Sequence, residues 1–373
     1  MASFDLQELI TRLGPVVSAD PDPRLRCRAV TLLAQHSAVG DPALSRGLRD
    51  PDPEVRLAAL TAGSRLGMQA GPALLACADG TKALSRAVVD ALSLVYRPHP
   101  VLLADLLMGA RREPERCAAI AALGRIKSPD MLPLLVELMD DPAVAVRAEV
   151  VSALGLYAAG GNADALDALE LACEDPEAVI RGAALSALVG SDATQDFMLE
   201  NALRREPDPH VRLTLIRALG ARHDESALSI VSLAMADVHP SVRRGAFLAA
   251  LSSPHSVGLA RFLDAMTTAD PVAAQIVRTD AVSHGVGKGL RRALADGPVE
   301  LRIAAARVLS WLDPSRFEEA LILGGQDPSP SVRAAVVQAL TRCDSDAARR
   351  ALLRAARDED VSVAALARVA VGR

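Results

Sequence analysis

Histidine and cysteine are the side chains best suited to metal binding or nucleophilic catalysis, and the chain has seven of the first and five of the second. His36, His223, His255 and Cys343 each follow the end of an expected helix. Two ligands of one zinc ion each lie about 2.1 Å from the metal, whereas adjacent packed helices are about 8–10 Å apart. We therefore expect these side chains to satisfy helix-end carbonyls, and we predict no metal site, no cofactor site and no catalytic residue.

The cysteines occupy recurring positions and form no CxxC pair. Cys27 and Cys117 directly follow a recurring arginine, while Cys77 and Cys173 lie two residues before a recurring aspartate. Because other copies often have Ala or Leu at these positions, we expect the cysteines to pack in the interior rather than sense redox state. An odd cysteine count without a secretory leader is typical of the reducing cytoplasm.

The segment Gly285–Gly289 (GVGKG) precedes an expected helix start, where backbone N–H groups can hold an anion. It lacks the GxxxxGK[ST] spacing of a nucleotide-binding loop, because Gly289 follows Lys288. Two interpretations stay open: a flexible joint and an anion site.

Composition excludes several classes of function. The chain has 41 Lys and Arg against 46 Asp and Glu, a net charge of −5, and only 2% aromatic residues. Nucleic-acid binding favours a basic face with stacking aromatics, and no apolar run is long enough to span a membrane. We expect a cytoplasmic protein that binds neither nucleic acid nor membrane. Nearly all positive charge is arginine, which indicates either a GC-rich bacterial genome or recognition of carboxylates.

A short phrase recurs along the chain: Asp-Pro, a few residues, an apolar residue, then Arg. Clear copies end at Arg26, Arg56, Arg147, Arg181, Arg212, Arg243, Arg302 and Arg333, with weaker copies at Arg86 and Arg116. The usual spacing is about 31 residues, and it doubles between Arg243 and Arg302. About twelve copies therefore occupy residues 1–373, which predicts a single all-α superhelical solenoid with a degenerate joint at 270–298.

Each copy contains two helical stretches, such as Met131–Asp140 and Val146–Tyr157. The residue before proline avoids the α region, so Asp-Pro ends the first helix. A second proline (Pro23, Pro53, Pro209 and Pro330) is placed at the start of the second helix, where its missing N–H costs nothing. Helices this short are marginal alone, so they must pack on each other and on neighbouring copies.

These motifs resemble the HEAT repeat, in particular the bacterial phycobilisome-lyase HEAT-like type. The resemblance rests on DPxxxVR followed by an Ala/Leu helix that ends in Leu-Gly, as in Arg116–Gly124, Arg147–Gly155 and Arg212–Gly220, and it covers nearly the whole chain. It implies a HEAT/armadillo-like fold that serves as an adaptor or scaffold, with bilin-lyase-like or other HEAT-type enzymes as the alternative. The di-iron enzymes of this fold use His-Glu pairs, which are absent here.

We expect the eight clear repeat arginines to form a structural ladder with the aspartates of neighbouring copies. The concave face is expected to present other positions of the second helix. Its candidate partner-binding residues are Arg65, Arg125, Arg217, Arg244, Arg307, Trp311 and Arg342. This pattern favours a non-catalytic scaffold that binds a protein partner through an acidic or helical segment. The apolar C-terminal stretch Val361–Arg373 leaves a monomer or a dimer through this end as open alternatives.

Overall fold

The computed structural model describes residues 6–36, 42–61, 67–222, 224–252, 262, 265, 270–279, 286–312 and 314–372. Within these ranges every regular element is a helix, which confirms the predicted all-α superhelical fold class. The chain divides into two compact units, Met1–Thr194 and Gln195–Arg373, which we call unit 1 and unit 2. Among the described residues, no helix is both long enough and apolar enough to cross a membrane.

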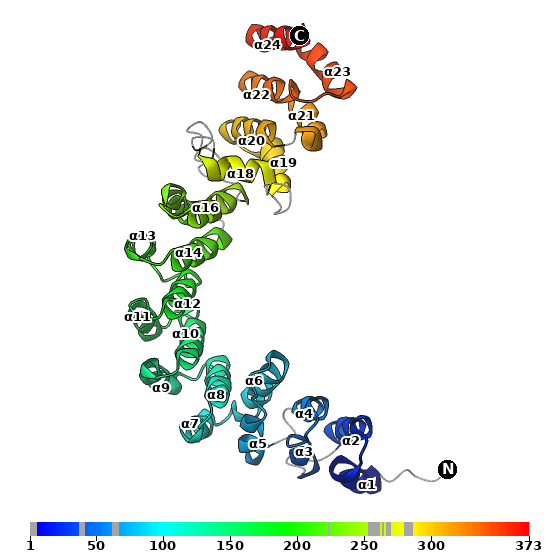
Figure 1. Ribbon diagram of the computed structural model, residues 1–373, viewed down its shortest axis with the longest axis vertical. Coiled ribbons are helices and arrows are strands. Elements are labelled where there is room, and N and C mark those ends of the chain that lie inside the picture. Colours follow the sequence, from blue (N-terminus) through cyan, green and yellow to red (C-terminus); the bar gives the residue numbers. More distant parts are fainter. Residues whose placement is uncertain are drawn as a thin grey trace, which may run out of the picture. The chain divides into compact units, whose positions relative to one another are not determined.

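Unit 1 consists of helical pairs that follow one another along the chain (Figure 1). Its first helices are α1 (Leu6–Ala19), α3 (Pro42–Gly47), α5 (Gly71–Ala76), α7 (Pro100–Gly109), α9 (Leu132–Glu137) and α11 (Ala163–Ala172). Its second helices are α2 (Pro23–His36), α4 (Pro53–Leu60), α6 (Lys82–Tyr96), α8 (Glu113–Ile126), α10 (Val144–Ala158) and α12 (Ala178–Val189). A second helix packs on its own first helix and on the second helices beside it, as α10 does on α9, α8 and α12.

Unit 2 has the same organisation. Its first helices include α13 (Asp196–Arg205), α15 (Glu225–Leu233), α19 (Val286–Asp296), α21 (Glu318–Gly324) and α23 (Asp346–Ala355). Its second helices are α14 (Pro209–Arg222), α16 (Pro240–Ser252), α18 (Pro271–Thr279), α20 (Val299–Trp311), α22 (Pro330–Leu340) and α24 (Val361–Val371). Short 3₁₀ turns, such as Ala234–Ala236 and Pro314–Phe317, join or extend the helices.

The recurring Asp-Pro phrases determine where the second helices begin. The four predicted prolines are the first residues of α2, α4, α14 and α22, as the sequence indicated. The second aspartate of the phrase caps the helix that follows. In α4, the Asp52 carboxylate accepts the backbone N–H groups of Glu54 and Val55 at 2.8 and 3.4 Å. A capping carboxylate of this kind stabilises a helix by about 1 kcal/mol, which offsets part of the cost of starting a short helix.

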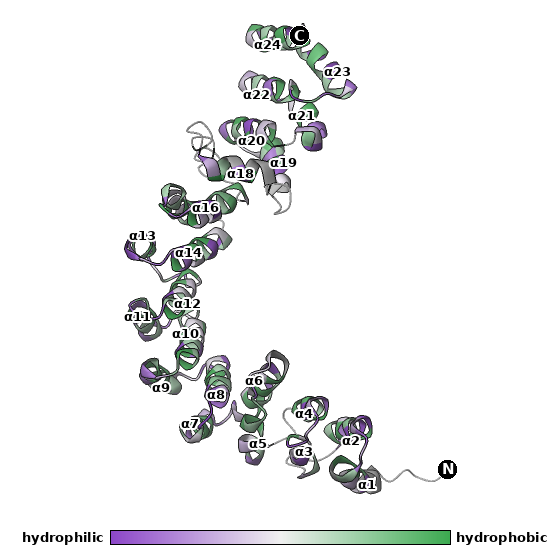
Figure 2. Cartoon of the chain, in the orientation of Figure 1, coloured by the Kyte–Doolittle hydropathy of each residue, from purple (hydrophilic) through white to green (hydrophobic). Residues whose placement is uncertain are grey.

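The interior is made from Leu, Val, Ile and Ala rather than from aromatic residues. Ile120, Leu123, Val150 and Leu154 are fully inaccessible between α8 and α10. Green apolar residues recur along the paired helices, interrupted by purple polar residues (Figure 2). Small side chains let adjacent helices approach closely, which suits a stacked array of short helical pairs.

Second helices approach one another closely at a recurring glycine. A Cβ on Gly124 would lie 2.8 Å from the Cβ of Ala153 and 3.0 Å from its Cα. The same contact joins Gly220 of α14 to Ala249 of α16, where the corresponding Cβ–Cβ distance would be 2.7 Å. In the sequence, the Leu-Gly ending indicates only a family resemblance. The structure shows that this glycine leaves room for the alanine of the next second helix.

Candidate functional site

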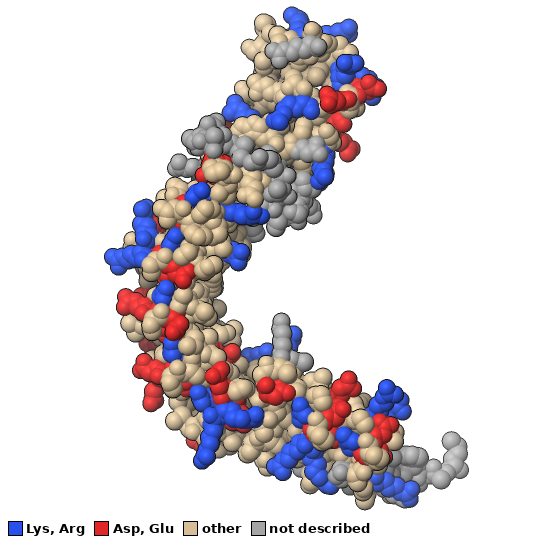
Figure 3. Space-filling model, in the orientation of Figure 1, with Lys and Arg blue, Asp and Glu red and all other residues tan. Residues whose placement is uncertain are grey.

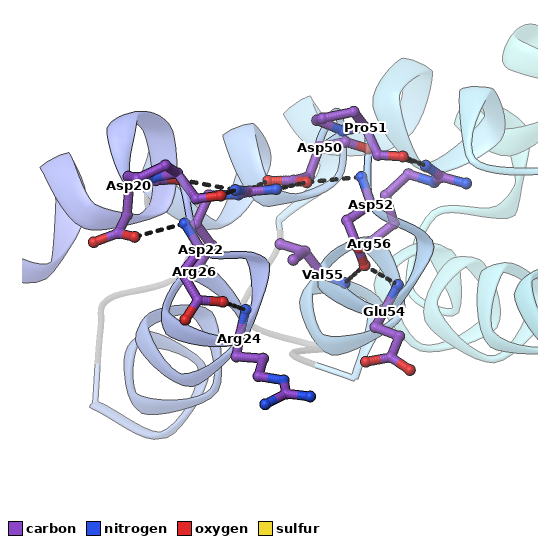
Figure 4. Close-up of polar contacts among 11 residues, drawn as sticks. Asp20, Asp22, Arg24, Arg26, Asp50, Pro51, Asp52, Glu54, Val55 and Arg56 are labelled. Atoms are coloured by element: carbon purple, nitrogen blue, oxygen red, sulfur yellow. Dashed lines mark hydrogen bonds and ion pairs between the residues drawn. The ribbon is translucent and has the colours of Figure 1, made fainter.

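The recurring arginines connect consecutive repeats through two kinds of hydrogen bond (Figure 4). Arg26 on α2 donates from Nε and Nη2 to the two carboxylate oxygens of Asp50, at 2.7 and 2.8 Å. Its Nη1 donates to the carbonyl of Asp20, at 2.8 Å, in the loop that precedes its own helix. The carbonyl of Asp50 in turn accepts from Arg56 at 3.0 Å. One aspartate therefore binds two successive arginines.

Equivalent ion pairs occur in both units. In unit 1 they join Arg26 to Asp50, Arg56 to Asp79, Arg116 to Asp141 and Arg147 to Asp175. In unit 2 they join Arg212 to Asp237, Arg243 to Asp270, Arg302 to Asp327 and Arg333 to Asp358. Arg181 donates to the carbonyls of Asp175 and Pro176 in its own repeat, each at 3.0 Å. We call this set the arginine ladder.

The ladder is interrupted where a repeat lacks either the arginine or the aspartate of the ion pair. Arg86 has the repeat register but is exposed, and the next repeat has Ala110 in the position of the usual aspartate. In α18 the arginine position is held by Ile276, which is fully buried. The last repeat likewise has the buried Ala364 in the arginine position. These repeats rely on apolar packing in place of the ion pair.

At the Arg212–Asp237 pair, the electrostatics favour the ionised forms of both partners. Hydrogen bonding to Asp237 raises the pKa of Arg212 despite the opposing effect of burial. Burial by itself would raise the pKa of Asp237, but hydrogen bonds from Arg212 and from the backbone of His239 outweigh it and lower that pKa. Arg212 and Arg333 are themselves buried, at 9% and 7% exposure. A buried charge removed from water needs such a partner.

A hollow of about 460 Å³ lies on the second helices of unit 2, between α14 and α16. We call it the unit 2 hollow. It is lined by Leu213, Arg217, Gly220, Ala221, Ser241, Arg244, Gly245, Leu248, Ala249 and Ser252. This lining combines an apolar floor with two arginines and includes no acidic residue. Two of the predicted partner-binding residues, Arg217 and Arg244, are thus brought together.

A second hollow, of about 490 Å³, lies on α6, α8 and α10, and we call it the unit 1 hollow. It is lined by Gly80, Ser85, Arg86, Val89, Glu113, Pro114, Cys117, Ala118, Ala121, Arg125, Glu149, Ser152, Ala153 and Leu156. Arg125, which we predicted to bind a partner, makes an ion pair with Asp90 of α6. Glu149, which is not among the predicted site residues, lies half-buried in the same hollow.

The remaining predicted residues are spread along the chain. Arg307 is exposed on α20, Trp311 is half-buried at the end of that helix, and Arg342 is exposed just beyond α22. Arg65 lies outside the described residues, as does Gly285 of the glycine-rich segment.

The histidine and cysteine positions agree in part with the packing interpretation. His36 is the exposed last residue of α2, whereas His223 and His255 lie outside the described residues. None of the five cysteines is in a disulfide; Cys77 and Cys343 are buried and the others are half-buried. The Cys77 thiol donates to the carbonyl of Leu48 at 2.9 Å. In the part of the chain that the structure describes, no three His, Cys, Asp or Glu residues cluster as metal ligands would.

Comparison with known proteins agrees with this architecture. A family model of HEAT repeats matches residues 10–93, 100–189 and 287–372, well over half of the chain. The chain therefore belongs to the HEAT-repeat family. A search of curated proteins finds none that matches it.

Solved structures with similar helical stacks share little sequence with this chain. An engineered protein is 17% identical, with a TM-score of 0.35, over 99% of this chain and 98% of its own. Yeast importin-β (Kap95p) is 12% identical, with a TM-score of 0.45, over 98% of this chain. The chain spans 56% of that importin. HEAT solenoids are typical of scaffolds that bind other proteins along extended surfaces.

Proposed function

We propose that this chain is a non-catalytic, cytoplasmic scaffold that binds an acidic or helical segment of a protein partner on the second helices of unit 2. The observation that carries the proposal is the unit 2 hollow, which has two arginines, apolar side chains and no acidic lining residue. An amphipathic segment would place apolar side chains against Leu213 and Leu248 and carboxylates against Arg217 and Arg244. From the DPxxxVR and Leu-Gly motifs, we also assign the repeats to the phycobilisome-lyase HEAT-like type.

The charges of the neighbouring second helices support an acidic partner. Helices α14, α16, α20 and α22 contain one acidic residue, Glu300, in the first turn of α20. Their ladder arginines are neutralised by aspartates, and Arg222 makes ion pairs with Asp196 and Asp224. Arg217 and Arg307 are exposed beyond these pairs, so the surface formed by the second helices has an excess of positive charge. Such a surface both attracts and orients an acidic segment.

Reversal of the two charges in the hollow tests this function. The double variant Arg217→Glu/Arg244→Glu is expected to lose at least 10-fold in affinity for a partner captured from the source cells, because carboxylates would then face carboxylates. Affinity is measured by surface plasmon resonance with the purified partner.

The matched control is Arg349→Glu/Arg350→Glu on the exposed side of α23, which changes the net charge equally away from the hollow. This control is expected to bind as the unmodified chain does. An equal loss of affinity in both double variants would show that only the net charge of the chain matters. It would refute a binding surface on the second helices of unit 2.

A further inference from the structure

The two units differ in charge as well as in sequence. Unit 1 has 18 Lys and Arg against 25 Asp and Glu, whereas unit 2 has 23 against 21. On the face shown in Figure 3, red acidic residues gather over α9 and α11 of unit 1. The unit 1 hollow therefore lies in an acidic part of the chain. Its ligand need not have the same charge as the ligand of the unit 2 hollow.

The charges around the unit 1 hollow cancel except at one residue. Arg125 makes an ion pair with Asp90. Arg86 and Glu113 are both exposed and carry one charge of each sign. Glu149 remains: it is half-buried, and among the described residues no hydrogen bond or ion pair reaches its carboxylate. A carboxylate that is partly shielded from water and accepts no hydrogen bond is stabilised by a cation placed beside it.

Burial disfavours negative charge in the unit 1 hollow. Burial raises the pKa of Glu149, and the positive charge of Arg125 offsets only part of that effect. Burial, followed by the negative charges of Glu149 and Glu113, raises the pKa of the Cys117 thiol to about 11. A cation placed in the hollow would oppose both shifts, because a positive charge beside the Glu149 carboxylate favours its ionised form.

We propose that the unit 1 hollow holds the ammonium or guanidinium group of a Lys or Arg side chain from a protein partner, with Glu149 as its counter-ion. The inference rests on the proposed scaffold function and gives it a second site of opposite charge. The hollow, at about 490 Å³, has room for a long side chain. Ala121, Ser152 and Ala153 offer small walls for its methylene groups.

Two labelled helical peptides that differ only in Lys or Glu at the same exposed positions provide the test. Fluorescence anisotropy measures the binding of each to the full chain. The Lys peptide is expected to bind about 10-fold more weakly to Glu149→Gln, which keeps the shape of the side chain and removes its charge. Glu113→Gln, on the exposed rim of the same hollow, is the control and is expected to change the affinity less than about 3-fold.

The double variant Arg217→Ala/Arg244→Ala separates this site from the one in unit 2. It is expected to weaken the Glu peptide and to leave the Lys peptide unchanged. Failure of the Glu peptide to bind would count against the proposed function alone. Absence of Lys-peptide binding, or equal binding to Glu149→Gln, would overturn the Glu149 site. Stronger binding of putrescine than of the Lys peptide would assign the hollow to a free amine and overturn the protein-partner assignment.

Discussion

Replacement of Arg212 by alanine is expected to lower the free energy of unfolding by about 1–3 kcal/mol. Arg212 donates to both carboxylate oxygens of Asp237, at 2.8 and 2.9 Å, and to the carbonyls of Glu206 and Pro207, each at 3.0 Å. The substitution removes all four hydrogen bonds and leaves a largely buried carboxylate without its cation. Thermal unfolding followed by circular dichroism measures the effect.

The matched control for this prediction is Arg217→Ala in the same helix. Arg217 is exposed, so its loss is expected to change stability by less than about 0.5 kcal/mol. An Arg212→Ala protein that melts at the same temperature as the unmodified chain would show that the ladder contributes nothing to stability.

Gly124→Ala is expected to destabilise unit 1, although alanine favours helices over glycine by about 1 kcal/mol. The added Cβ would lie 2.8 Å from the Cβ of Ala153 and 3.0 Å from its Cα, which is backbone and cannot rotate away. Forcing α8 and α10 apart costs about 1–3 kcal/mol, which exceeds the gain in propensity. Urea unfolding of the two proteins measures the difference.

The same substitution at Gly109 is expected to have the opposite sign. Gly109 ends α7, and a Cβ there would meet nothing within 4 Å. Gly109→Ala is therefore expected to stabilise the chain by about 0.5–1 kcal/mol. If both alanine variants proved stabilising, close contact between second helices would not explain the recurring glycine.

Much of the fold could be predicted because the local signals and the packing agree. Proline at the first helical position and the recurring phrase before each arginine located the start of α4 and of α22. The cap formed by Asp52 and the Gly124–Ala153 contact were not predicted. Asp52 was interpreted only as part of the repeat phrase, and the Gly124–Ala153 contact joins two separate helices. The division between Thr194 and Gln195 has no marker that we recognised in the sequence.

The positions that form the candidate surface could be predicted from the repeat spacing, but the pairing of their charges could not. Arg217 and Arg244 were selected by their distance from the repeat arginine, and both line one hollow. Arg125 was selected in the same way, yet its partner Asp90 lies 35 residues earlier, on α6. Glu149 is an ordinary acidic residue in the sequence. That no described residue donates a hydrogen bond to its carboxylate depends on how α6, α8 and α10 pack. Ion pairs between repeats depend on tertiary packing, which the spacing of residues within one helix does not predict.

The scaffold interpretation is tested most directly by asking which face of unit 2 touches the captured partner. A photo-reactive p-benzoylphenylalanine in place of Ala221 would stand in the unit 2 hollow, and one in place of Ser229 would stand on the exposed side of α15. Mass spectrometry of the irradiated complex is expected to find partner peptides joined at position 221 and none at position 229. Cross-links from position 229 alone would place the partner on the first helices and contradict the account.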